Sequence, residues 1–147
     1  MKRCYLFILA GVVSATTLLT SCCTIEPVTD FGDLIDRLRQ AGAEVEITVD
    51  TVRNVHLSVE GVIIVVDGEE VQVFEYEDID RTQLEFKGVT SSPSVVVFEE
   101  GEPPLMERIP LNRQCYHSGR FILFYDGEDE AVLKILRMTV GCPYDYL

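Results

Sequence analysis

The chain has 147 residues, of which 25 are Asp or Glu and 12 are Lys or Arg, and its formal net charge is −13. A chain of this length can bury a core as one modest domain without help from disulfides. The excess of acid argues against a nucleic-acid-binding protein, whose phosphate contacts need Lys and Arg, and against a polybasic membrane contact.

The N-terminus has the organisation of a secretory signal. Lys2 and Arg3 precede an almost wholly apolar run over residues 5–19, and the sequence LTSC follows at residues 19–22, where that run ends. These four residues resemble a bacterial lipobox, which implies cleavage before Cys22 and attachment of lipid to its thiol. An ordinary cleaved signal and an uncleaved anchor are the alternatives. The anchor is disfavoured because the apolar run is shorter than the ~20 residues of a spanning helix.

We therefore expect a lipoprotein signal peptide at residues 1–21, a lipidated tether at 22–29 and a single domain at 30–147. This organisation places the protein at the cell membrane, lipid-anchored on the extracytoplasmic face. One acyl chain binds membranes reversibly, so stable anchoring needs more than one, and the pathway that the motif resembles supplies a diacylglycerol. Removal of the signal also removes two positive charges, so lipid on Cys22 is the expected membrane contact.

The first expected element is a helix over residues 31–38. Asp30 is a suitable N-cap with Asp33 three residues later. Apolar residues then repeat at helical spacing along one face, and Gly42 ends the helix from the C′ position.

Strands are expected next at residues 45–49, 57–59, 62–66 and 71–76. Asp67-Gly68 lies between the last two. This pair predicts a type I′ hairpin turn, which needs positive φ at both central residues. Valines 71 and 73 are expected on one face of the returning strand, and Phe74 and Tyr76 on the other.

The second half of the chain contains shorter segments separated by breaks. The expected elements are a short helix at 79–87, a strand at 94–98, its partner at 105–109, an irregular loop at 110–119, a strand at 121–125 and a helix from Asp129 to Gly141. The strands are joined by tight turns instead of regular crossovers. This order favours an α+β fold with a mostly antiparallel sheet and helices packed on one face, a two-layer sandwich.

Three cysteines remain beyond the signal and the lipidated Cys22. Cys115 precedes a strand and Cys142 follows a helix, so these two could meet in a disulfide in an exported protein. Two separate thiols are the alternative. Cys23 lies beside the anchor and has no evident role, and the sequence contains no Cys/His cluster with zinc spacing.

Few residues have a pattern that suggests chemistry. Cys115, His117 and Ser118 lie close together in sequence, whereas a catalytic Cys and His come from distant parts of a chain. An ordinary turn explains them. Residues 126–130 offer oxygen ligands for Ca²⁺ but lack the spacing that wraps an ion, and acids at a helix N-terminus explain them. We therefore expect no catalytic residue, no metal site and no cofactor.

Arg113, Tyr116 and Arg120 form a candidate binding surface. They lie close together in a chain that is short of cations, and Arg and Tyr are enriched in binding hot spots. An envelope protein is the partner that such a surface would serve. The alternative is that Tyr116 packs beneath the loop while the two arginines balance local acids.

Several segments resemble a family of small bacterial lipoproteins. They are residues 31–42, LSVEG at 57–61, DGEEVQVFEY at 67–76 and YHSGRFILFYDGEDEAVLKIL at 116–136. Family members carry patterns such as VNGEDVQVFEY and YxxGRLIVLYVGDDPxVxxxL, so the resemblance covers most of the mature domain. It implies an exported, anchored domain and transfers no catalytic residue. This chain departs from the family where Arg113-Gln114 replaces a frequent Pro-His, and it lacks Trp.

The sequence thus favours a non-catalytic, lipid-anchored extracytoplasmic domain that binds a partner or supports an envelope assembly. A lipoprotein that binds a small solute or a divalent cation through its acidic turns is the runner-up. A hydrolase is the third alternative.

Overall fold

The computed structural model describes residues 25–91, 94–97, 105–108 and 113–144. The expected signal peptide, Cys22, Cys23 and the residues between the expected strands at 94–98 and 105–109 lie outside these residues. In chain order the described elements are α1 (Phe31–Gln40), β1 (Val45–Arg53), β2 (Glu60–Val66), β3 (Glu69–Glu75), α2 (Ile79–Ser91), β4 (Ser94–Val97), β5 (Leu105–Arg108), β6 (Gln114–Ser118), β7 (Phe121–Tyr125) and α3 (Glu130–Val140).

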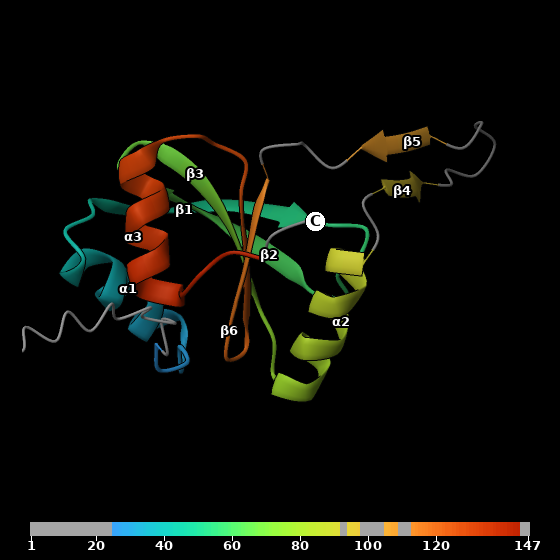
Figure 1. Ribbon diagram of the computed structural model, residues 1–147, viewed down its shortest axis with the longest axis horizontal. Helices are drawn as coiled ribbons and strands as arrows, with labels where there is room; N and C mark the ends of the chain where they lie inside the picture. The colour runs from blue at the N-terminus through green and yellow to red at the C-terminus, as the bar shows by residue number, and fades with distance from the viewer. Residues whose placement is uncertain (1–24, 92–93, 98–104, 109–112, 145–147) are drawn as a thin grey trace, which may run out of the picture.

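Five strands form one antiparallel sheet in the order β1-β2-β3-β7-β6, and β4 pairs with β5 in a separate ladder. Figure 1 shows α1 and α3 on one side of the sheet, α2 on the other side, and the β4–β5 ladder standing apart beyond α2. The α+β class with an antiparallel sheet is therefore confirmed.

Strand β7 explains why helices cover both faces of the sheet. All five of its residues are buried, and successive side chains of a strand point to opposite faces. Phe121, Leu123 and Tyr125 pack with α1 and α3, whereas Ile122 and Phe124 pack with α2. The helices thus form three layers with the sheet instead of the expected two, because a strand that is apolar on both sides needs a cover on each.

The turn between β2 and β3 is the one that the sequence predicts. Asp67 and Gly68 have φ values of 51° and 89°, as a type I′ turn requires. Asp67 also accepts a hydrogen bond from Glu44 N at 2.7 Å, which ties this turn to the start of β1. We call this end of the sheet, at Asp67-Gly68, the hairpin end. The opposite end, at the β6–β7 turn around Gly119, is the turn end.

Two segments differ from the expected pattern. Residues 57–59 form no strand. They follow the turn at residues 55–56, and Leu57 is buried on the α2 side of the sheet. Residues 114–118, expected within a loop, form the edge strand β6. Cys115 packs on the α2 side and Tyr116 on the α3 side. The strand therefore shows no alternation of apolar and polar residues that would reveal it.

Phe124→Ala tests the packing of α2 on the sheet. The Phe124 ring is 1% exposed and lies 5.6 Å from the Phe74 ring, so its removal should lower the free energy of unfolding by about 3–5 kcal/mol. Leu84→Ala is the control, because Leu84 lies on the same helix layer but is 71% exposed, and a loss within about 0.5 kcal/mol is expected. Urea denaturation followed by circular dichroism measures both, and equal losses would contradict this packing.

Candidate functional site

Residues 25–29, which we call the N-terminal strap, lie against the domain. Val28 is 2% exposed and belongs to the core beneath α1 and α3. Its backbone N–H donates to Ser118 Oγ at 3.0 Å, at the end of β6. Residues 25–29, expected in the tether, therefore pack with the folded domain.

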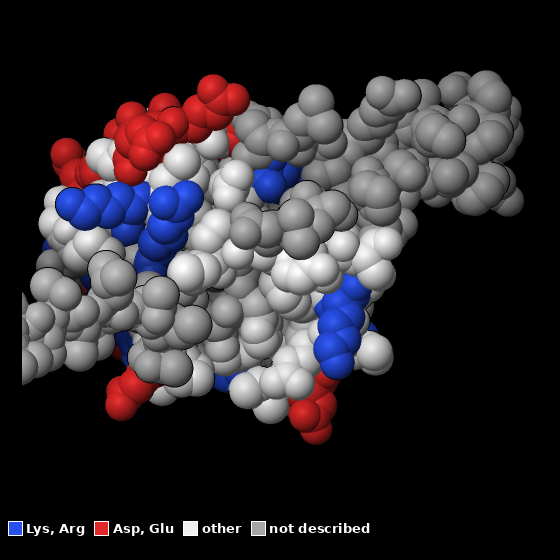
Figure 2. All heavy atoms as spheres, in the orientation of Figure 1, with Lys and Arg blue, Asp and Glu red and all other residues white. Residues whose placement is uncertain are grey.

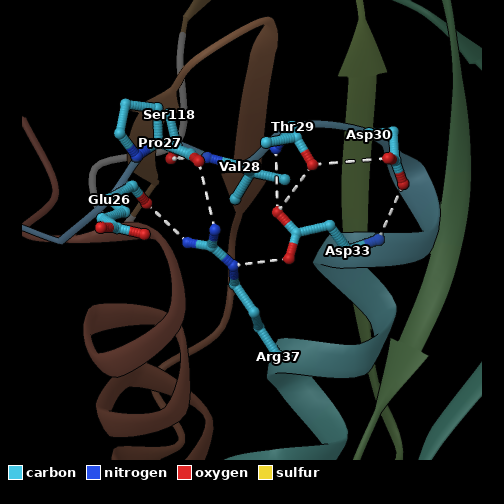
Figure 3. A network of polar contacts seen from close by, with 8 residues as sticks. All are labelled: Glu26, Pro27, Val28, Thr29, Asp30, Asp33, Arg37 and Ser118. Carbon is cyan, nitrogen blue, oxygen red and sulfur yellow. Dashed lines mark hydrogen bonds and ion pairs between the residues drawn. The ribbon is translucent and has the colours of Figure 1, made fainter.

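Arg37 and Arg120 hold the backbone carbonyls of the strap. Arg37, on α1, donates to Glu26 O at 2.5 Å and to Pro27 O at 3.2 Å (Figure 3). Arg120 donates to Thr29 O at 3.0 Å. Because these contacts are made to main-chain oxygens, they fix the path of the strap whatever its side chains are. Hydrogen bonds from a charged donor are also stronger than neutral ones.

Asp33 joins the strap to the first turn of α1. Its carboxylate accepts hydrogen bonds from Thr29 N at 2.9 Å and from Arg37 Nε at 2.8 Å. The hydrogen bond from Arg37, followed by that from Thr29 N, lowers the pKa of Asp33. Asp30 accepts from Asp33 N at 2.9 Å, so the predicted N-cap is confirmed.

Gly119 allows the strap to approach the β6–β7 turn. Its φ is +59°, and a Cβ atom at this position would lie 2.4 Å from the carbonyl oxygen of Val28. Glycine is therefore favoured both by the backbone conformation and by the close approach. Ser118, Gly119 and Arg120 are consecutive, and all three contact the strap.

Arg113, Tyr116 and Arg120 do not share one surface. Tyr116 is fully buried beneath α1 and α3, and burial raises its pKa to about 12. Arg113 pairs with Asp126 through two contacts of 2.6 and 2.7 Å and lies 5.1 Å from the Phe124 ring centroid, on the α2 side. Arg120 holds the strap. The alternative interpretation, a packed tyrosine with arginines that balance acids, fits this geometry.

Cys115, His117 and Ser118 do not converge on a reacting centre. The His117 ring lies 5.0 Å from the Phe86 ring of α2, and Cys115 packs on the same face. Ser118 points to the opposite side, toward Val28. Burial lowers the pKa of His117, which favours its neutral form.

Cys115 is buried and Cys142 is exposed. Cys115 packs on the α2 face, whereas Cys142 follows α3 on the other face. Tyr144 N then donates to Cys115 O at 2.7 Å, so the chain after Cys142 reaches the outer edge of β6. A Cys115–Cys142 disulfide stays a prediction.

Two of the four acids at residues 126–130 have other partners. Asp129 caps α3 by accepting from Ala131 N and Val132 N at 2.8 and 3.1 Å, and Asp126 pairs with Arg113. Within the described ranges, no group of three or more His, Cys, Asp or Glu residues is arranged to hold a metal ion.

Glu85, on α2, is a polar centre that sequence reasoning missed. Its carboxylate accepts from Ser58 N, Ser58 Oγ, Tyr76 Oη and Arg81 Nε at 2.8, 2.6, 2.7 and 3.1 Å. Burial raises the pKa of Glu85, but the hydrogen bonds from Ser58, Tyr76 and Arg81 outweigh burial and lower it to about 2. The network ties α2 to the segment before β2 and to the end of β3. The spacing of Arg81 and Glu85 is the sequence signal that could have identified part of it.

Two hollows open on the described surface. One, of about 520 Å³, is lined by the segment between β1 and β2. The other, of about 430 Å³, lies between Phe31, Ile47 and the strands β2 and β3. The hydrogen bonds of the strap lie outside both hollows. Polar contacts from α1, from the end of β6 and from the β6–β7 turn converge on the strap, so it is the candidate functional site.

No family model, curated protein or solved structure matches this chain. Among the residues that the structure describes, no helix is both long enough and apolar enough to cross a membrane.

Gly119→Ala tests the close approach of the strap. The added methyl group should displace Val28 O and increase hydrogen exchange at the Val28 amide, measured by mass spectrometry or NMR. Gly42→Ala is the matched control, because Gly42 also has positive φ but a Cβ there meets no atom within 4 Å. The control should be destabilised by backbone strain alone, with Val28 protected. Equal protection of Val28 in both variants would contradict the contact.

Glu85→Gln tests the network on α2. The folded-state pKa of Glu85, about 2, lies below its ordinary value of 4.5. Its ionised form therefore stabilises the fold above pH 4.5, and this contribution is lost as the pH falls toward 2. Glu85→Gln should lower stability at pH 7 and weaken the pH dependence between 4.5 and 2. Urea denaturation across this range measures the effect, with Glu77→Gln, an exposed acid, as the control that keeps the slope. An unchanged slope in Glu85→Gln would contradict the network.

Proposed function

We propose that this protein is a bacterial lipoprotein anchored on the extracytoplasmic face of the cell membrane by lipid on Cys22. Its domain has a non-catalytic role, binding a partner or supporting an envelope assembly. The lipobox-like sequence at residues 19–22 is the basis for the anchor, since it stands where an apolar signal segment ends.

The observation that best supports this proposal is the set of hydrogen bonds by which Arg37 and Arg120 hold the strap. Arg37 holds the carbonyl of Glu26, only four positions after Cys22. Four extended residues span about 14 Å at most. A chain attached to lipid at Cys22 would therefore enter the core a few residues later, at Val28. The domain would stay close to the bilayer. A domain held at this height can serve a partner that is itself at the membrane surface.

The runner-up function, binding of a divalent cation or small solute, has less support. Its candidate ligands at residues 126–130 include Asp126, which pairs with Arg113, and Asp129, which caps α3. A carboxylate that is already bound by a guanidinium or by backbone N–H groups is a poorer ligand for a cation, because those contacts must first be given up.

Cys22→Ala tests the anchor. Wild-type protein expressed in a bacterium should fractionate with membranes and incorporate labelled palmitate, whereas Cys22→Ala should lose both properties. Cys23→Ala is the matched control, since it removes the neighbouring thiol and should retain both. If Cys22→Ala still carries the label and stays in the membrane fraction, the proposed anchor is wrong.

A further inference from the structure

Cys142 lies at the turn end of the sheet, where the strap is also held. Tyr144 pairs with Cys115 in an antiparallel bridge, with Tyr144 N donating to Cys115 O at 2.7 Å. In an antiparallel pair the two chains run in opposite directions. Cys142, two positions before Tyr144, therefore lies beside the part of β6 that follows Cys115 and ends at Ser118.

The strap passes the same end of β6. Val28 N donates to Ser118 Oγ at 3.0 Å, and a Cβ at Gly119 would clash with Val28 O. Figures 1 and 3 both place the strap next to the C-terminal end of α3, and that helix ends two residues before Cys142. The strap and Cys142 are therefore neighbours at the end of β6.

Cys142 lies on the α3 side of β6, whereas Cys115 lies on the α2 side. Burial raises the pKa of Tyr116, and the nearby Arg137 and Cys142 also act on this pKa, in opposite directions. Because Tyr116 packs beneath α1 and α3, Cys142 approaches β6 from that side. Cys115 is fully buried in the cluster beneath α2. A bond between Cys115 and Cys142 would therefore join side chains on opposite sides of β6.

The last turns of α3 carry two cations. Figure 2 shows Lys and Arg side chains over the region where Figure 1 places this helix, and its exposed cations are Lys134 and Arg137. Arg137 and Cys142 both act on the pKa of Tyr116, so they lie near one another. A nearby cation favours the thiolate form of a cysteine, and the thiolate is the form that attacks a disulfide. Arg137 therefore favours disulfide exchange at Cys142.

Cys23 is a cysteine that the chain can bring to this place. It lies three positions before Glu26, and three extended residues span about 10 Å. Arg37 holds the carbonyl of Glu26 at the start of the strap, so Cys23 stays within this reach of the strap. A disulfide needs two Cα atoms that lie about 4–7 Å apart. The length of the chain therefore permits a bond between Cys23 and Cys142.

We propose that Cys23 and Cys142 form a disulfide that ties the lipid-bearing end of the chain to the end of α3. This proposal rests on the proposed function, because an exported protein meets the oxidising conditions in which disulfides persist. The bond forms by exchange with the disulfide of an extracytoplasmic thiol oxidoreductase. The S–S bond of that enzyme breaks and the bond between Cys23 and Cys142 forms. The two electrons and two protons lost by the two thiols reduce the enzyme to its dithiol.

The bond gives the strap a covalent attachment beside the lipid. Arg37, Ser118 and Arg120 hold the strap through hydrogen bonds, whereas the disulfide lies one residue after the proposed lipid site, Cys22. A pull on the lipid then passes into α3 and does not separate the strap from β6. Reduction of the bond leaves the noncovalent contacts of the strap to hold the domain.

Counting the thiols of the full lipidated protein tests the bond. Bacteria that express it are treated with acid to prevent exchange, and the mature chain is denatured and labelled with a maleimide polymer that shifts a gel band once for each thiol. The wild type should carry one label, on Cys115. Cys23→Ala and Cys142→Ala should each carry two labels, and Cys115→Ala should carry none. A Cys115–Cys142 bond predicts the reverse, with no label on Cys23→Ala and two on Cys115→Ala.

Hydrogen exchange measures the hold on the strap. Reduction of the wild type should increase exchange at the Val28 amide several-fold, whereas Cys23→Ala should show the faster exchange with or without reductant. Cys115→Ala is the matched control, since it removes a thiol outside the bond and should respond to reduction as the wild type does. Equal exchange at Val28 in the oxidised and reduced wild type would overturn this role of the bond.

The outcomes distinguish the bond from the anchor. Three labels on a wild-type protein that incorporates palmitate, no label on its Cys23→Ala variant, or a dimer on a non-reducing gel overturns the bond and leaves the anchor intact. A protein without palmitate overturns the anchor and carries at least one additional label, because the thiol of Cys22 is then present. If Cys23→Ala and Cys142→Ala each still gain one label in that protein, the bond stands without the anchor.

Discussion

The burial of β7 on both faces is the constraint on which the rest of the structure depends. A strand of five apolar and aromatic residues cannot leave either side in water, so it needs α3 and α1 on one face and α2 on the other. The same strand pairs with β3 and β6, which places it inside the sheet. The turn that leads into β7 supplies Ser118, Gly119 and Arg120, so the position of the strap follows from the position of this strand.

The elements that could be predicted are those whose information is local. Asp67-Gly68 specifies its turn because few residue pairs tolerate positive φ twice, and Asp30 caps α1 through a neighbour three residues away. The strap could not be predicted in this way. Val28 is one apolar residue in a short polar segment, and its partner Ser118 lies 90 positions later. Local patterns carry no information about such a pairing, although Gly119 in the turn was a signal of close approach.

The candidate binding surface shows the same limit more sharply. Proximity in sequence suggested that Arg113, Tyr116 and Arg120 act together. Alternation along β6 and β7 instead sends Tyr116 to one face of the sheet and Arg113 to the other. Residues 110–119 appeared irregular because the polar and apolar side chains of β6 are buried on both sides. Where a strand is covered twice, sequence periodicity cannot assign a residue to a face.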